Sequence, residues 1–289
     1  MPARPWLTRA LPCLLLLSGR AIEPTHRDVA YDNDHPAQCL DVYQATSATP
    51  TPVVVYIHGG GWRGGSKRGI PGFLASAVNE GWLSVVAVEY RFTDVAPHPA
   101  QARDCQRAVQ FTRSKAREWN LDPNRVGATG GSAGAHLSLW IALHDDAANR
   151  EAADPVERES SRVACAVGFA GPTDWRLLST LEHKHPAYRQ LLGYAPGTPA
   201  AEMAEDLKVD VSPVNFASKD DPPVLLVHGD ADDIVPIEHS RVLDERLDAV
   251  GVPSELLVIP GARHEVAGGG GAAAAQAKAF FRKHLAGSP

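Results

Sequence analysis

The sequence predicts an α/β fold with a mostly parallel central sheet, helices on both faces and a small lid insertion. From Asp28 onward, short apolar segments alternate with longer helix-like segments, which is the pattern of a parallel sheet built from βα units. Residues 224–227 are entirely apolar, as expected for a strand buried on both faces. A chain of 289 residues can form one such domain with a large core, and its length does not require a second.

The expected elements follow in order along the chain. Strands are predicted over residues 38–43, 53–57, 83–90, 125–129, 163–170, 224–227 and 256–259, because these runs are short, apolar and often β-branched. Helices are predicted over the longer segments between and after them, at residues 70–80, 101–119, 133–144, 236–250 and 272–285. No internal repeat is visible.

A Gly-Gly-Ser-Ala-Gly motif at residues 130–134 stands between the strand-like residues 125–129 and the third helix. A serine between small residues at a strand-to-helix turn is held in a strained, exposed position, as a hydrolase nucleophile requires. Side chains in place of Gly130 and Gly134 would collide with the backbone of so tight a turn. The motif makes Ser132 the candidate nucleophile, the alternative being a chance glycine-rich loop.

A His-Gly-Gly-Gly-Trp motif at residues 58–62 follows the strand-like residues 53–57. Acyl transfer passes through a tetrahedral oxyanion, which preorganised donors must meet. Glycines allow backbone amides to approach such an oxygen closely. We therefore expect the amides of Gly60 and Gly61, with that of Ala133, to form an oxyanion hole. The alternative is a glycine turn followed by a packed tryptophan.

Three acids, Asp230, Asp232 and Asp233, follow the apolar residues 224–227. A carboxylate at the end of a buried strand is well placed to orient a histidine. Asp232 is favoured for this role, and the other two are expected to cap the loop or form hydrogen bonds within it. The alternative is that all three are ordinary turn residues.

His264 follows the last apolar strand, residues 256–259, on a loop from which its ring can reach Ser132. Neutral imidazole there can take the hydroxyl proton and later return it to the leaving group. His136 is expected to be a packed core residue. Surface or local hydrogen-bonding roles are expected for His98, His144, His183, His185, His239 and His284. His183 and His185 are two apart and have no third ligand nearby, so neither a metal nor a cofactor is predicted.

The order serine, aspartate, histidine along the chain is that of the α/β-hydrolase fold. With these motifs the chain resembles the esterase/lipase branch of that superfamily, near its BD-FAE-like and hormone-sensitive-lipase-like groups. Residues 89–91, residues 99–101 and Asp104 also match the pattern. The likeness runs from about residue 28 to the C-terminus. The acid loop, residues 228–232, is closer to small carboxylesterases and serine peptidases, and the long N-terminal cap of the hormone-sensitive-lipase group is not expected.

The resemblance implies that Ser132 is the nucleophile, His264 the base and Asp232 its orienting acid. The implied activity is cofactor-free hydrolysis of a small or medium acyl ester through an acyl-enzyme. If the protein is exported, the substrate class extends to acetyl or feruloyl esters on polysaccharide. An arylformamidase, a serine peptidase of the same fold and a non-catalytic binding protein are the alternatives.

Two segments interrupt the βα alternation, and a third precedes the last helix. Residues 145–162 are charged and predict an exposed loop or short helix. Residues 174–221 hold several aromatic and proline residues and overhang the nucleophile in this fold. We interpret them as a lid that shapes the substrate pocket, the alternative being an insertion without such a role. Residues 268–275 are low in complexity and predict a flexible joint.

The N-terminal residues 1–21 combine Arg4 and Arg9 with a short apolar run, which predicts a signal peptide and export to the periplasm or medium. The run is too short for a stable membrane span. The alternative is a loose N-terminal arm on a cytoplasmic protein. A net charge of −6 gives no reason to expect a nucleic-acid partner. Outside this segment, at most one disulfide can form, among Cys39, Cys105 and Cys165. Oligomeric state is not predicted.

Overall fold

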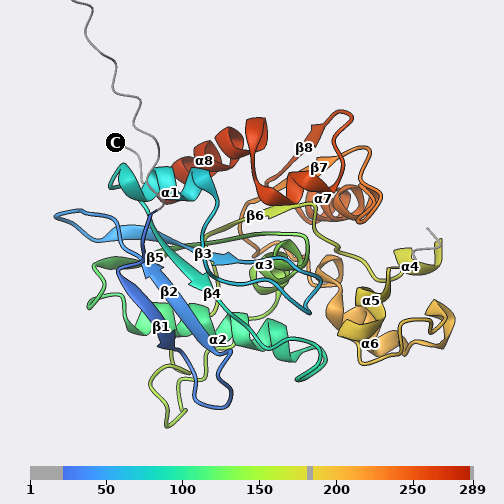
Figure 1. The fold of residues 1–289 in the computed structure, drawn as a ribbon, viewed down its shortest axis with the longest axis horizontal. Coiled ribbons are helices and arrows are strands. Elements are labelled where there is room, and N and C mark those ends of the chain that lie inside the picture. Colours follow the sequence, from blue (N-terminus) through green and yellow to red (C-terminus); the bar gives the residue numbers. More distant parts are fainter. Residues whose placement is uncertain (1–21, 181–184, 287–289) are drawn as a thin grey trace, which may run out of the picture.

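A computed structural model describes residues 22–180 and 185–286. Within these residues the strands form one eight-stranded sheet of order β1-β2-β4-β3-β5-β6-β7-β8 (Figure 1). The strands are β1 (His26–Ala30), β2 (Cys39–Tyr43), β3 (Thr51–Ile57), β4 (Ser84–Val88), β5 (Leu121–Gly131), β6 (Cys165–Phe169), β7 (Val224–Gly229) and β8 (Ser254–Ile259). The predicted signal peptide, residues 1–21, lies outside the described residues.

The sheet is mostly parallel, as predicted. Only the β1–β2 and β2–β4 pairs are antiparallel among the described strands. β3 has β4 on one side and β5 on the other, so the order of the strands reverses at this point. Ile57 of β3 pairs with Gly130 of β5. The loops that leave these two strands therefore begin side by side, at the kind of edge where open α/β sheets bind ligands.

Helices cover both faces of the sheet, because alternate residues of the strands point to opposite sides. Val53 and Val55 of β3 belong to one apolar cluster, and Val54 between them belongs to the other. The first cluster packs against α2 (Ala100–Ser114), α3 (Ala133–Leu143) and α7 (Glu238–Val250). The second packs against α1 (Gly72–Asn79) and α8 (Gly271–Leu285), which lie together above the sheet in Figure 1.

The seven predicted strands and five predicted helices are all present, with shifted ends. β1 was not predicted, because its sequence His-Arg-Asp-Val-Ala has no apolar alternation and it lies at the edge of the sheet. The second helix ends at Ser114 rather than at residue 119, since the chain turns there and the amide of Leu121 bonds back to the carbonyl of Ala116. The predicted joint at residues 268–275 is wrong in its second half, because α8 begins at Gly271.

The described residues of the 174–221 insertion form short helices beside α3, at the end of the sheet shown on the right of Figure 1. They are α4 (Leu177–Thr180), α5 (Pro186–Leu191), η1 (Ala200–Glu202), α6 (Glu205–Val211) and η2 (Pro213–Asn215). The indole of Trp140 in α3 donates to the carbonyl of Asp210 at 2.8 Å. Every residue of α3 is buried, because the sheet covers one side and this insertion another.

Candidate active site

Ser132 occupies a strained turn between β5 and α3. Its φ of 55° and ψ of −120° are unusual for a residue with a side chain. A Cβ at Gly130 would lie 2.3 Å from the carbonyl oxygen of Ile57, and one at Gly134 would lie 2.0 Å from the same oxygen. The two glycines therefore let the turn pack against the end of β3. The amide of Ser132 donates to the carbonyl of Phe169, which fixes the turn to β6.

The structure brings Ser132, His264 and Asp232 into one line of hydrogen bonds. His264 Nε2 lies 3.0 Å from Ser132 Oγ, and His264 Nδ1 lies 2.8 Å from Asp232 Oδ2. A carboxylate can only accept, so Nδ1 donates to it and Nε2 is left to accept the serine hydroxyl proton. His264 lies in η3 (His264–Gly268) after β8, and Asp232 follows β7. The ends of β5, β7 and β8 thus supply the three side chains of one site.

The carboxylate of Asp232 is held as an anion by its neighbours. Burial alone raises its pKa, but nearby His228 and His264 and the amides of Val235 and Ile234 outweigh burial and hold the pKa far below its usual range. The two amides donate to Asp232 Oδ1 at 2.9 Å each. Its side chain is fully buried, so no water competes for these bonds.

The other two acids of the loop do not orient the histidine, as expected, but they bond residues of the neighbouring loop rather than residues within their own. Asp230 Oδ1 accepts the amide of Gly261 at 2.6 Å, and Asp233 pairs with Arg263. Both contacts tie the acid loop to the loop that carries His264. The ring of His264 bonds Asp232 and Ser132 instead, and neither of the other two carboxylates among the described residues.

The glycine loop after β3 leaves two amides available beside Ser132. Gly60 and Gly61 have positive φ angles of 119° and 61°. Neither amide donates to another backbone group within residues 22–180 and 185–286. Ala133 is the first residue of α3, so its amide has no acceptor inside the helix. Gly60 and Gly61 line the same hollow as Ser132, and none of the three predicted oxyanion donors bonds a backbone acceptor among the described residues.

Two anchors that the sequence analysis missed hold this loop in place. His58 Nε2 lies 2.8 Å from Glu89 Oε1, and the His58 ring stacks on Tyr90. The ammonium of Lys67, almost fully buried, bonds Asp41 Oδ1 at 2.7 Å. A buried lysine is costly unless paired. The spacing of Lys67 and Asp41 in the sequence gives no signal that they meet.

His136 links the glycine loop to the lid-like insertion. Its Nδ1 accepts from the indole of Trp62 at 3.2 Å, and its Nε2 donates to the carbonyl of Val211 at 2.7 Å. Burial lowers the pKa of His136 to about 3, so the ring is neutral at physiological pH. Trp175 packs against both aromatic rings. The prediction that His136 is a packed core residue agrees with this position.

Two other histidines correct the sequence analysis. His98 and His239 were expected at the surface or in local contacts, but both are buried. His98 Nε2 lies 2.8 Å from Asp210 of α6, 112 residues away. The ring of His239 accepts the amide of Asp174, the first residue of the insertion, through Nδ1 at 3.3 Å. Both therefore join the insertion to the main domain. His183 lies outside the described residues.

Ser132 opens into a hollow of about 460 Å³. Gly60, Gly61 and His264 line it, and Arg63 and His185 contribute from the glycine loop and from the residue before α5. No aspartate or glutamate lines this hollow among the described residues. Burial and the positive charges of Arg63 and His264 lower the pKa of His185. The site is thus of a size for a small molecule, and its described lining residues carry no negative charge.

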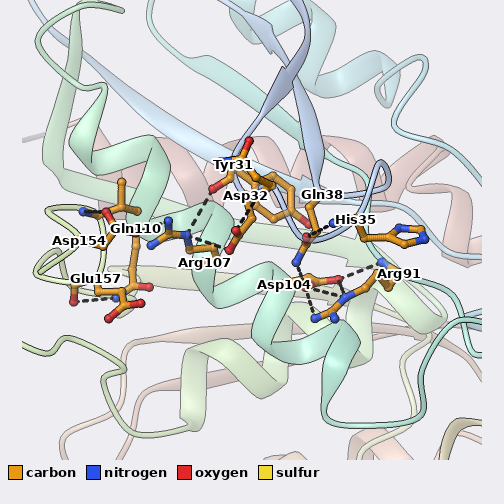
Figure 2. A network of polar contacts seen from close by, with 12 residues as sticks. Tyr31, Asp32, His35, Gln38, Arg91, Asp104, Arg107, Gln110, Asp154 and Glu157 are labelled. Atoms are coloured by element: carbon orange, nitrogen blue, oxygen red, sulfur yellow. Dashed lines mark hydrogen bonds and ion pairs between the residues drawn. The ribbon is translucent and has the colours of Figure 1, made fainter. Parts of the chain in front are cut away.

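A separate polar network surrounds Asp104 of α2 (Figure 2). Its carboxylate accepts from the guanidinium of Arg91 at 2.7 Å and from the amide side chain of Gln38 at 2.9 Å. One turn further along α2, Arg107 pairs with Asp32 and Asp154. The residues around 89–91 and Asp104 that matched the family pattern therefore join β4, β2 and α2.

Three further features of the described residues concern the cysteines, metal binding and membrane spans. Cys39, Cys105 and Cys165 are free thiols, and no disulfide joins them. Within the described part of the chain, no cluster of three or more His, Cys, Asp or Glu side chains is arranged to hold a metal ion. No helix of the described residues is both long and apolar enough to cross a membrane.

Comparison with known proteins identifies the family of this chain. Residues 40–247 match the family model described as BD-FAE, which covers more than half of the chain. The chain belongs to the BD-FAE family. The resemblance inferred from the motifs is thereby confirmed.

Relatives and solved structures support the same assignment. This BD-FAE chain is 32% identical over 247 residues to esterase LipC of Mycobacterium tuberculosis, covering 83% of this chain and 59% of LipC. An acetyl ester-xyloside bifunctional hydrolase from Caldicellulosiruptor lactoaceticus superposes with a TM-score of 0.72 and 27% identity, over 85% of this chain and 87% of that one. A truncated carbohydrate esterase from gut microbiota gives a TM-score of 0.75 with 24% identity, over 91% of this chain and 99% of that one. The last comparison shows the α/β-hydrolase fold alone.

Proposed function

We propose that this BD-FAE family member is a serine carboxylic-ester hydrolase. The observation that carries the proposal is the pair of contacts made by His264, 3.0 Å to Ser132 Oγ and 2.8 Å to Asp232 Oδ2. The esterase names of its relatives support the same reaction class. The chain spans between one half and three fifths of the length of those curated relatives, 59% of LipC and 53% of LipM.

In the first half-reaction, Ser132 Oγ attacks the ester carbonyl carbon as His264 Nε2 takes the hydroxyl proton. The carbonyl oxygen becomes an oxyanion and accepts hydrogen bonds from the amides of Gly60, Gly61 and Ala133. The carbon–oxygen bond to the alcohol then breaks, and the alcohol leaves with the proton from His264. Asp232 stabilises the imidazolium that exists between these two proton transfers.

In the second half-reaction, water replaces the alcohol. His264 takes a proton from the water as its oxygen attacks the acyl-serine carbonyl. Collapse of the second oxyanion breaks the bond to Ser132 Oγ, which recovers its proton. The products are the carboxylic acid and unmodified enzyme. Apart from the ester and one water molecule, these steps use only side chains and amides of the chain.

Small or medium acyl esters, including acetyl groups on saccharides, are the substrate class we propose. The hollow of about 460 Å³ is of a size for small molecules. One solved structure at 27% identity is titled an acetyl ester-xyloside bifunctional hydrolase, and that name motivates the saccharide option.

A substrate panel tests the proposal. Purified wild-type protein and the Ser132→Ala variant are assayed on 4-nitrophenyl acetate, butyrate and octanoate, acetylated xylan, a feruloyl ester, N-formylkynurenine and a peptide amide. We expect wild-type turnover of short esters and a loss of at least 10³-fold in Ser132→Ala. Near-native ester turnover by the variant contradicts the serine mechanism. Preference for N-formylkynurenine or the peptide identifies one of the two alternative hydrolases.

A further inference from the structure

Arg63 is a positive charge beside the candidate oxyanion hole that the fold does not neutralise. Its Nε atom lies 3.8 Å from the position that a Cβ on Gly61 would take. The side chain is exposed and lines the hollow that contains Ser132. The guanidinium therefore stands a few ångströms from one of the amides proposed to bind the oxyanion.

The hydrogen-bond partner of Arg63 is a neutral side chain. Its Nη1 donates to the neutral amide oxygen of Gln190 in α5 at 2.7 Å. No carboxylate pairs with it among the described residues, whereas Arg91 pairs with Asp104 and Arg263 with Asp233. Gln190 holds the guanidinium in position and leaves its charge available to a ligand.

The residues that line two neighbouring hollows indicate on which side of Arg63 a negatively charged group of a ligand would bind. The hollow around Ser132 has no acidic side chain among its described lining residues, although the chain carries a net charge of −6. Arg63 also lines a second hollow of about 330 Å³, together with Asp94 and Tyr194. Asp94 disfavours an anion there. A negative group is therefore best accommodated on the Ser132 side of Arg63.

We infer that Arg63 selects ester substrates that carry a carboxylate close to the scissile bond. This inference rests on the proposed esterase function and narrows its substrate class. Arginine suits this task because its planar guanidinium can donate two parallel hydrogen bonds to one carboxylate. The carboxylate belongs to either the acyl or the alcohol part of the ester, since both lie near the oxyanion during the reaction.

Matched pairs of charged and neutral esters test the inference. For the acyl part, mono-4-nitrophenyl adipate is compared with its carboxamide, 4-nitrophenyl adipamate. For the alcohol part, 3-acetoxybenzoate is compared with 3-acetoxybenzamide. In each pair only the carboxylate differs, so the ratio of kcat/KM values reports recognition of the charge. The protein variants are Arg63→Gln, Arg63→Lys and, as a control, Arg68→Gln.

Arg68 is a matched control because it is also exposed and lies on the same loop, but it does not line either hollow. We expect the wild type to favour the carboxylate about tenfold or more in at least one pair. The pair that shows it identifies the acyl or the alcohol part. Arg63→Gln is expected to bring that ratio to about one, Arg63→Lys to an intermediate value, and Arg68→Gln to leave it at the wild-type value. The wild-type ratio should also decline as salt concentration rises.

Two results overturn the inference while leaving the esterase function intact. One is a wild type that hydrolyses both neutral esters as well as or better than their charged partners. The other is an Arg63→Gln variant that keeps the wild-type ratio. A wild type that turns over no ester of the panel instead contradicts the proposed function, and this inference with it.

Discussion

The ring of His228 contacts the carboxylate of Asp232, with 3.5 Å between His228 Nε2 and Asp232 Oδ2. His228 itself is fully buried at the end of β7. Its Nε2 donates to the carbonyl of Val235 at 2.7 Å, and its Nδ1 lies 2.6 Å from the hydroxyl of Ser240. His228 thus holds the acid loop in place through buried contacts, and Asp232 of the same loop orients His264.

Replacement of His228 tests this positioning role. In His228→Leu the carbonyl of Val235 and the hydroxyl of Ser240 lose their partner. We expect the free energy of unfolding to fall by about 1–3 kcal/mol. We also expect kcat to fall more than KM changes, because Asp232 would no longer be held for the transition state. His228→Gln retains an amide donor and should lose less of both. Equal kinetics in wild type and His228→Leu would show that the contact is structural only.

The three acids of one loop allow a controlled test of the carboxylate. In Asp232→Asn the side chain can no longer hold the proton of His264 on Nδ1. We therefore expect kcat to fall on the order of 10³–10⁴-fold. Asp230→Asn and Asp233→Asn change acids that bond Gly261 and Arg263 instead. We expect these two variants to retain kcat within about tenfold, because exposed ion pairs contribute little free energy. A larger loss in Asp230→Asn than in Asp232→Asn would reassign the acid.

The glycine loop offers a pair of substitutions that differ in the space around the new Cβ and in backbone conformation. A Cβ at Gly60 would lie 2.1 Å from the carbonyl oxygen of Gly64, and the φ of Gly60 is 119°. Nothing lies within 4 Å of a Cβ at Gly64. Gly60→Ala should therefore displace the loop and lower kcat/KM by about 10²-fold or more, as loss of an oxyanion donor does. Gly64→Ala should stay close to wild type. Steady-state kinetics on a short ester, with circular dichroism to verify folding, distinguishes the two.

The buried His136 makes stability depend on pH in a defined window. Its pKa is lowered to about 3 in the folded protein, against about 6.5 for an exposed histidine. Between these values the unfolded state binds one more proton, so stability is full above about pH 6.5 and declines as pH falls toward 3. The slope from this residue approaches 1.4 kcal/mol per pH unit.

Urea unfolding at a series of pH values measures that slope. His136→Gln can still accept from Trp62 and donate to Val211, but it does not titrate. We expect the variant to be less stable at pH 7 and to show a shallower decline between pH 6 and 4. Parallel curves for the two proteins in this window would contradict a neutral His136.

Much of the fold and of the candidate site could be predicted from the sequence. The features that could not be predicted were missed for physical reasons. Ser132, His264 and Asp232 follow apolar strands directly, so their positions at one sheet edge follow from parallel packing. β1 escaped prediction because an exposed edge strand needs no apolar alternation. The contacts of Lys67 with Asp41 and of His98 with Asp210 join segments far apart in the chain. Only the folded geometry shows that such side chains meet, and the same holds for the contact of Arg63 with Gln190.

Covalent labelling of the nucleophile tests the central claim most directly. The native protein is incubated with a fluorophosphonate, which phosphonylates an activated serine, and is then digested and analysed by mass spectrometry. The account predicts one adduct, on Ser132, formed in step with loss of ester turnover and absent from Ser132→Ala and from heat-denatured protein. Full ester turnover by protein that is completely labelled, or an adduct on a different serine that accounts for the lost activity, would contradict it.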